Sequence, residues 1–133
     1  MKRVTLALVI LAVLVMLPSS NSVAQKLGEK VYWMATIEVP LGNLTDYHSL
    51  LQKEQLPTME KYGYTFVGVW QTIVGDIENV IILAEFSDMN AYNTARRAFI
   101  GSDEWKVISK KAVELNTHTK TAFLNAAPYS KMK

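Results

Sequence analysis

The sequence predicts an α+β fold, in which an antiparallel four-stranded sheet is covered on one face by two helices. Two apolar runs, 64–73 and 79–86, flank a short turn at Gly75-Asp76, which is typical of a β-hairpin. After Ser87 the apolar spacing lengthens from two residues to three or four, which indicates an amphipathic helix. A strand and a helix precede the hairpin, and a strand-like segment follows the last helix. This βαββαβ order predicts a ferredoxin-like sandwich.

The segment before the hairpin reads as a strand followed by an interrupted helix. Side chains alternate over 31–39, and a break at 40–43 precedes the helical spacing. Pro57 lies inside that helical pattern, where its ring and its missing amide hydrogen should kink the helix. We expect a helix to about Leu56 and one or two further turns that end at Gly63.

The segment after the hairpin predicts a helix with a break and then a final strand. Gly101 interrupts the apolar spacing, which resumes behind Ser102, a residue suited to cap a helix. The segment 117–124 is rich in Thr and contains Phe, as strands often are. The remaining residues, 126–133, suggest an exposed tail.

The hairpin is apolar on both faces, which bears on assembly. Strict alternation along its first strand would place Phe66 and Trp70 on one face of the sheet, and Val67, Val69 and Ile73 on the other. The helices cover one face only, so the second face of a single subunit would stay in water. We therefore expect two sheets to pack face to face in a homodimer.

The N-terminus, residues 1–24, has the three parts of a secretory signal peptide. These are a basic start at Lys2-Arg3, an apolar run over 4–17 and a small-x-Ala cleavage site that ends at Ala24. A membrane anchor is the alternative, but the run is shorter than the roughly 20 residues that cross a bilayer core. We expect a secreted or periplasmic protein with no stable membrane insertion after cleavage.

The expected mature chain, 25–133, is one domain and is formally neutral. Removing 1–24 takes away two of the 14 Lys and Arg and none of the 12 Asp and Glu, which leaves 12 of each. This balance argues against a nucleic-acid partner. The chain has no cysteine, so its stability must come from packing, to which a subunit interface would add.

Several short motifs match a known family. They are Gly68-Val69-Trp70, Thr72, Gly75, Asn79, Glu85-Phe86-Ser87, Arg96-Arg97 and Glu104-Trp105. With these residues the chain resembles the NIPSNAP family of the dimeric α/β-barrel superfamily over roughly 31–125. The family usually has Asp-Pro-Glu-Trp at the last motif; Ser102-Asp103 here keep a helix cap but lose the proline. The resemblance implies a dimeric α/β barrel and no defined reaction.

Carboxylates and histidines are the first candidates for chemistry. Glu38 and Glu85 extend strand faces that are largely apolar, where burial would raise the pKa of a carboxyl group and suit it to proton transfer. The alternative is that both lie at strand ends in solvent. His48 and His118 belong to different elements without paired ligand spacing, so no metal site is predicted.

Aromatic residues are the second candidates, because they could line a pocket for a flat apolar ligand, as the superfamily resemblance implies. They could equally belong to the core. The kink at Pro57 would open space between the first helix and the sheet. Arg96-Arg97 could bind an anion or simply cover the helix surface. The candidate pocket residues are Glu38, Tyr47, His48, Tyr62, Trp70, Glu85 and Trp105.

Two functions are compatible with the sequence. The first is an exported dimeric protein that binds a small apolar ligand or another protein and has no defined reaction. The alternative, implied by the superfamily resemblance, is a cofactor-independent monooxygenase or a haem-handling enzyme. No recognisable catalytic motif is present, and no cofactor is predicted. An enzyme of this kind would require Glu38, His48 and Glu85 to converge on one cavity.

Overall fold

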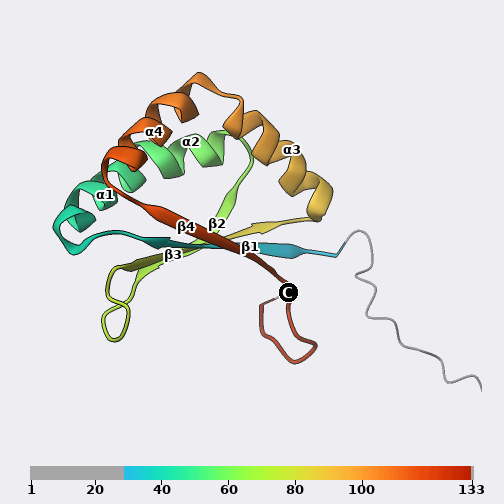
Figure 1. Cartoon of the computed structure of the whole chain (residues 1–133). Helices are drawn as coiled ribbons and strands as arrows, with labels where there is room; N and C mark the ends of the chain where they lie inside the picture. Colours follow the sequence, from blue (N-terminus) through green and yellow to red (C-terminus); the bar gives the residue numbers. More distant parts are fainter. Residues whose placement is uncertain (1–28, 133) are drawn as a thin grey trace, which may run out of the picture.

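The computed structural model describes residues 29–132, so the expected signal peptide, residues 1–24, lies outside the described residues. The strands form one sheet in the order β2-β3-β1-β4, and every neighbouring pair is antiparallel. All of the helices lie on one face of this sheet (Figure 1). This is the predicted ferredoxin-like βαββαβ sandwich. The strands are β1 (Val31–Glu38), β2 (Thr65–Gln71), β3 (Asn79–Phe86) and β4 (His118–Leu124).

Two helical segments cover the sheet. The first contains a short 3₁₀ turn (Leu41–Asn43), α1 (Leu44–Leu50), a π-helical turn (Leu51–Gln55) and α2 (Leu56–Lys61). The second is divided at Gly101 into α3 (Met89–Ile100) and α4 (Asp103–Glu114), as predicted. The side chain of Asp88 caps the start of α3, and that of Ser102 caps the start of α4.

The kink expected at Pro57 takes the form of a wide turn. The π-helical residues lie immediately before α2, and the backbone stays in the right-handed helical region at Leu51, Gln55 and Leu56. A wider turn accommodates a proline because its ring would collide with the carbonyl four residues earlier in a regular α-helix. The helix then ends before Gly63, whose φ of 101° favours glycine.

The core lies between the sheet and the helices. Alternate residues of β1 and β3 point toward the helices and are almost wholly buried, among them Ala35, Ile37 and Ile82. Tyr64, just before β2, is the centre of an aromatic cluster. Its ring packs against five others: Trp33, Phe66, Phe86, Tyr92 and Phe99.

Strand β2 departs from the strict alternation that the sequence suggested. A β-bulge between Phe66 and Gly68 shifts the register, so that Phe66 pairs with Ala84 on the helix side while Trp70 pairs with Ile81 on the opposite side. The predicted placement of Phe66 and Trp70 on one face is therefore wrong, because one extra residue reverses every side chain that follows it.

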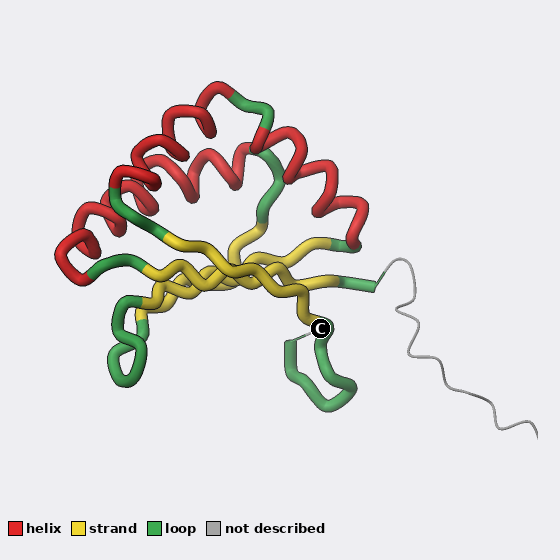
Figure 2. Tube along the Cα trace, in the orientation of Figure 1, coloured by secondary structure: helices red, strands yellow, loops and turns green. Residues whose placement is uncertain are grey.

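The same strand also ends earlier than expected. β2 stops at Gln71, and residues 72–78 form a loop in which Ile73 is 88% exposed. This loop and the C-terminal segment after β4 both project on the side of the sheet away from the helices (Figures 1 and 2).

The face of the sheet without helices carries a band of apolar side chains. Trp70 and Ile81 lie in one row across the strands, and Leu83, Met34 and Ala122 lie in the next. Trp70 is half-exposed, and its ring lies over Gly68, where an added Cβ would come within 2.7 Å of it. Within residues 29–132 no helix has the length and hydropathy needed to span a membrane.

Candidate ligand-binding cavity

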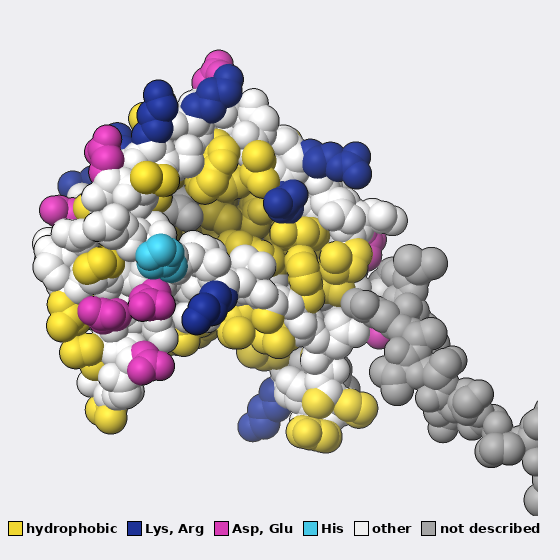
Figure 3. Space-filling view, viewed as in Figure 1, with side chains coloured by type: hydrophobic (Ala, Val, Ile, Leu, Met, Phe, Trp, Pro, Cys, Tyr) yellow, Lys and Arg dark blue, Asp and Glu magenta, His cyan; other side chains and the backbone are white. Residues whose placement is uncertain are grey.

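A cavity of about 320 Å³ lies between the helices and the sheet. Figure 3 shows it as a hollow lined with hydrophobic side chains, with a basic side chain at its rim. Its floor is formed by Trp33, Ala35 and Ile37 from β1 and by Ile82 from β3. The cavity opens toward the edge strand β4, whose exposed Thr119 and Thr121 form the lower rim.

The helices supply the other walls. Gln55, in the π-helical turn, and Met59, in α2, form one wall, so the wide turn before Pro57 helps to shape the cavity. Phe99 and Ile100 from α3 and Trp105 from α4 form another. The ring centroids of Trp105 and Phe99 are 4.8 Å apart. The backbone amide of Trp105 donates to the Ser102 hydroxyl at the start of α4.

Two tyrosines bring hydroxyl groups to the cavity. The rings of Tyr64 and Tyr92 meet edge to face, with their centroids 6.5 Å apart. Burial raises the pKa of both hydroxyls, most clearly that of Tyr64, above the ordinary range, in which a tyrosine is already protonated at neutral pH. Both groups can therefore donate a hydrogen bond. Neither hydroxyl has a hydrogen-bond partner within residues 29–132, and neither oxygen is fully buried.

Arg96 is the one charged side chain among the residues that line this cavity. It lies one turn after Tyr92 on α3, and its positive charge opposes the rise in the pKa of both tyrosines. No carboxylate of the described chain forms an ion pair with it. The arrangement can hold a largely apolar molecule with a polar group at one end.

Comparison with known proteins identifies the family. The family model described as NIPSNAP matches residues 32–131, which is most of the chain. The chain belongs to the NIPSNAP family. A search of curated proteins found no match.

Solved structures of other NIPSNAP proteins share this fold. A NIPSNAP family protein of unknown function from Agrobacterium tumefaciens aligns with a TM-score of 0.73 at 16% identity, covering 80% of this chain and 96% of its own. An uncharacterised NIPSNAP domain protein from Burkholderia xenovorans aligns with a TM-score of 0.68 at 20% identity, covering 75% and 97%. SnoaB, a cofactor-independent oxygenase from Streptomyces nogalater, aligns with a TM-score of 0.58 at 12% identity, covering 79% and 99%. At these identities the likeness concerns the fold alone.

The candidate residues that the sequence suggested for this NIPSNAP protein are scattered. Of these residues, only Trp105 lines the cavity between helices and sheet. Tyr47 is buried in the core, and Trp70 lies on the opposite face of the sheet. Tyr62 is partly buried against the core beside the Phe99 ring, and its hydroxyl donates to Glu104 at 3.2 Å.

The three residues that an enzyme would have needed in one place are also apart. His48 is 2.8 Å from the side-chain oxygen of Gln71 and so links α1 to the end of β2. Glu85 accepts a hydrogen bond from Lys30 at one end of the open sheet face. Glu38 lies at the other end of that face. None of the three lines the cavity.

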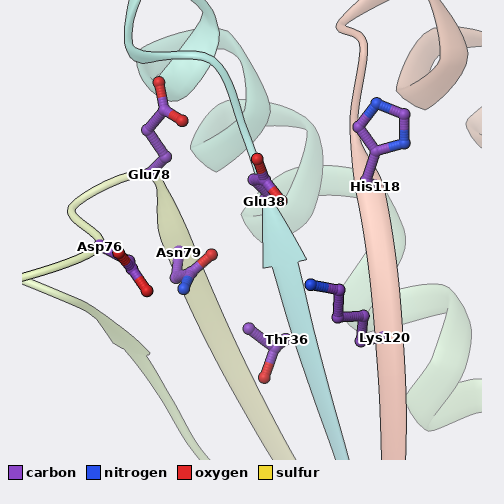
Figure 4. A pocket seen from close by; sticks show the side chains of 7 residues that line it. All are labelled: Thr36, Glu38, Asp76, Glu78, Asn79, His118 and Lys120. Carbon is purple, nitrogen blue, oxygen red and sulfur yellow. The ribbon is translucent and has the colours of Figure 1, made fainter.

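Glu38 instead belongs to a second, polar hollow of about 260 Å³ on the open sheet face (Figure 4). Its walls come from β1, β3, β4 and the loop before β3. Thr36 of β1 pairs with Lys120 of β4, so these two residues lie side by side in the hollow. Within the described chain no group of three or more His, Asp or Glu is placed to hold a metal ion. The lining residues are Thr36, Glu38, Asp76, Glu78, Asn79, His118 and Lys120.

Sequence reasoning missed most of the cavity because its lining comes from separate segments. One signal was available: Arg96 falls on the apolar stripe of α3, between the buried Tyr92 and Phe99. An arginine can lie on such a stripe because its long side chain reaches from the apolar face to solvent.

Proposed function

We propose that this NIPSNAP protein is exported, forms a homodimer and binds a small, largely apolar ligand in the cavity between helices and sheet. The observation that carries the proposal is the cavity itself. Its volume of about 320 Å³ is within the range of small-molecule sites, and its lining combines many apolar side chains with a few polar ones.

Export rests on the pattern of residues 1–24, and the homodimer on the apolar band around Trp70 and Leu83. An uncovered apolar sheet face is a common site of association between copies of one chain. The ligand cavity lies on the opposite side of the sheet, so a dimer formed in this way would leave the cavity accessible.

A binding role has more support than the enzymatic alternative. The enzymatic alternative depended on Glu38, His48 and Glu85 sharing one cavity, and each of them lies elsewhere. The chain shares its fold with a cofactor-independent oxygenase, but a shared fold alone does not bring that protein's reactive groups with it. The cavity's own polar side chains suit recognition of a ligand.

A thermal-shift screen of the purified protein with haem, quinols and fatty acids tests the proposal. A ligand that binds only the folded state stabilises it by roughly 2.7 kcal/mol at a hundredfold excess over its dissociation constant. The matched variants are Thr121→Phe, which narrows the cavity mouth, and Ala98→Phe, which adds the same ring to the outer surface of α3. We expect the shift to be lost in Thr121→Phe and kept in Ala98→Phe. Equal shifts in both variants would place the binding site elsewhere.

A further inference from the structure

The cavity is electrostatically one-sided. Arg96 supplies a positive charge at its rim, and no acidic residue is among the residues that line it. Four ion pairs connect other charged groups of the described chain, but Arg96 takes part in none of them. Guanidinium groups normally meet carboxylates or phosphates, with which they form paired, charge-assisted hydrogen bonds.

Further hydrogen-bond donors line the same cavity. The hydroxyls of Tyr64 and Tyr92 are both without a hydrogen-bond partner within residues 29–132, and both residues line the cavity. Gln55 contributes an amide from the facing wall, and its side-chain nitrogen has only the weak acceptor sulfur of Met59, at 4.0 Å. A cavity that combines one positive charge with several donors suits an acceptor-rich, negatively charged group.

The rest of the cavity suits the other end of such a molecule. The apolar part of the lining includes Trp33, Ala35, Ile82, Phe99 and Trp105, which offer aromatic and aliphatic surface. A neutral apolar ligand would fill this space but would offer no acceptor to the buried Tyr64 and Tyr92 or to Arg96, which is exposed at the rim. A buried hydroxyl that loses water without gaining a partner costs free energy.

We infer that the ligand is an amphipathic monoanion whose apolar body lies against the aromatic walls and whose carboxylate meets the guanidinium of Arg96. This inference rests on the proposed ligand-binding function and adds the chemical class of the ligand. In this inference Arg96 makes the site prefer charged ligands to neutral ones. The tyrosine hydroxyls orient the carboxylate.

The test uses pairs of probes that match in shape and differ in charge, such as 2-naphthoate with 2-naphthamide and decanoate with decanamide. Affinities are measured by isothermal titration calorimetry on the parent protein, on Arg96→Gln and on Arg97→Gln. Arg97 is the neighbouring residue on α3 and does not line the cavity, so its replacement is a matched control for the loss of one charge.

We expect the parent and Arg97→Gln to bind each acid roughly tenfold more tightly than its amide, because charge-assisted hydrogen bonds are the stronger ones. Arg96→Gln should lose this preference through weaker binding of the acid, with the affinity for the amide unchanged. Tyr92→Phe should reduce the preference in part. Amides that bind as tightly as acids, or a preference that survives Arg96→Gln, would overturn the inference and leave the binding function intact. Failure of every probe to bind would overturn both.

Discussion

Tyr64 shows how much of this fold depends on single side chains. Its ring contacts those of five other aromatic residues, drawn from β1, β2, β3 and α3. Edge-to-face contacts of this kind add to the free energy gained by burying the rings. The same residue lines the cavity, so the core and the candidate site meet at this position.

Replacement of Tyr64 by alanine should therefore be costly. We expect the free energy of unfolding to fall by about 3–5 kcal/mol, as for other large aromatic residues removed from a core. Tyr129→Ala is the control, because Tyr129 is 92% exposed and its loss should change stability by less than about 0.5 kcal/mol. Urea denaturation followed by circular dichroism measures both values. Similar stability for the two variants would mean that Tyr64 does not hold the aromatic cluster together.

At the scale of elements, the start of α4 depends on one serine. The Ser102 hydroxyl accepts from the Trp105 amide at 3.1 Å and donates to the Phe99 carbonyl at 2.6 Å, so it joins the end of α3 to the start of α4. Because Trp105 and Phe99 both line the cavity, this cap also helps to position its wall.

Loss of the cap should destabilise the protein measurably. Ser102→Ala removes both hydrogen bonds, and we expect a decrease of about 1 kcal/mol in the free energy of unfolding, the usual cost of losing a helix cap. Ser109→Ala, in the exposed middle of the same helix, should be neutral or slightly stabilising, because alanine favours helix interiors. Chemical denaturation of both variants is the measurement. A smaller loss at Ser102 than at Ser109 would contradict this account of the α3–α4 junction.

The elements were predictable from sequence to different degrees. Periodicity indicated all four strands, the stop at Gly63 and the break at Gly101, because these features depend on local propensity. The bulge in β2 had one signal, Gly68, because a glycine inside a strand pattern often marks a bulge, but the shift in register depends on the pairing with β3. The π-helical turn was detectable only as a disturbance around Pro57, whose exact form depends on tertiary packing.

The cavity was less predictable than the fold, for a reason that concerns the whole molecule. Its lining comes from β1, β3, β4, the residue before β2 and both helical segments, and the spacing of residues along the chain does not show which side chains will meet. Trp105 was identified as an aromatic residue that belongs to the recognised Glu104-Trp105 motif. Tyr64 and Gln55 had no such marker.

The apolar sheet face should support a homodimer. Leu83→Asp places a charge in the middle of that face, next to Met34 and Gly68, and should shift the protein to a folded monomer. Val113→Asp is the control, because Val113 is 74% exposed on α4, on the helical side of the sheet. Analytical ultracentrifugation gives the oligomeric state, and circular dichroism confirms folding. A Leu83→Asp protein as associated as the parent would rule out this interface.

Export should remove the first 24 residues. Intact-mass measurement of the protein recovered from outside the cytoplasm should give a chain that begins at Gln25, because the small-x-Ala site ends at Ala24. A full-length chain recovered in the membrane fraction would instead support the membrane anchor.

The central claim is that a small ligand occupies the space between helices and sheet, and the three tryptophans test it together. Trp33 and Trp105 line the cavity, whereas Trp70 lies on the opposite face of the sheet. In a ¹⁵N-labelled protein each indole N–H gives one NMR signal. Titration with the compound that stabilises the protein most should move the signals of Trp33 and Trp105 and leave that of Trp70 in place. Movement of the Trp70 signal alone, or of none of the three, would contradict binding in this cavity.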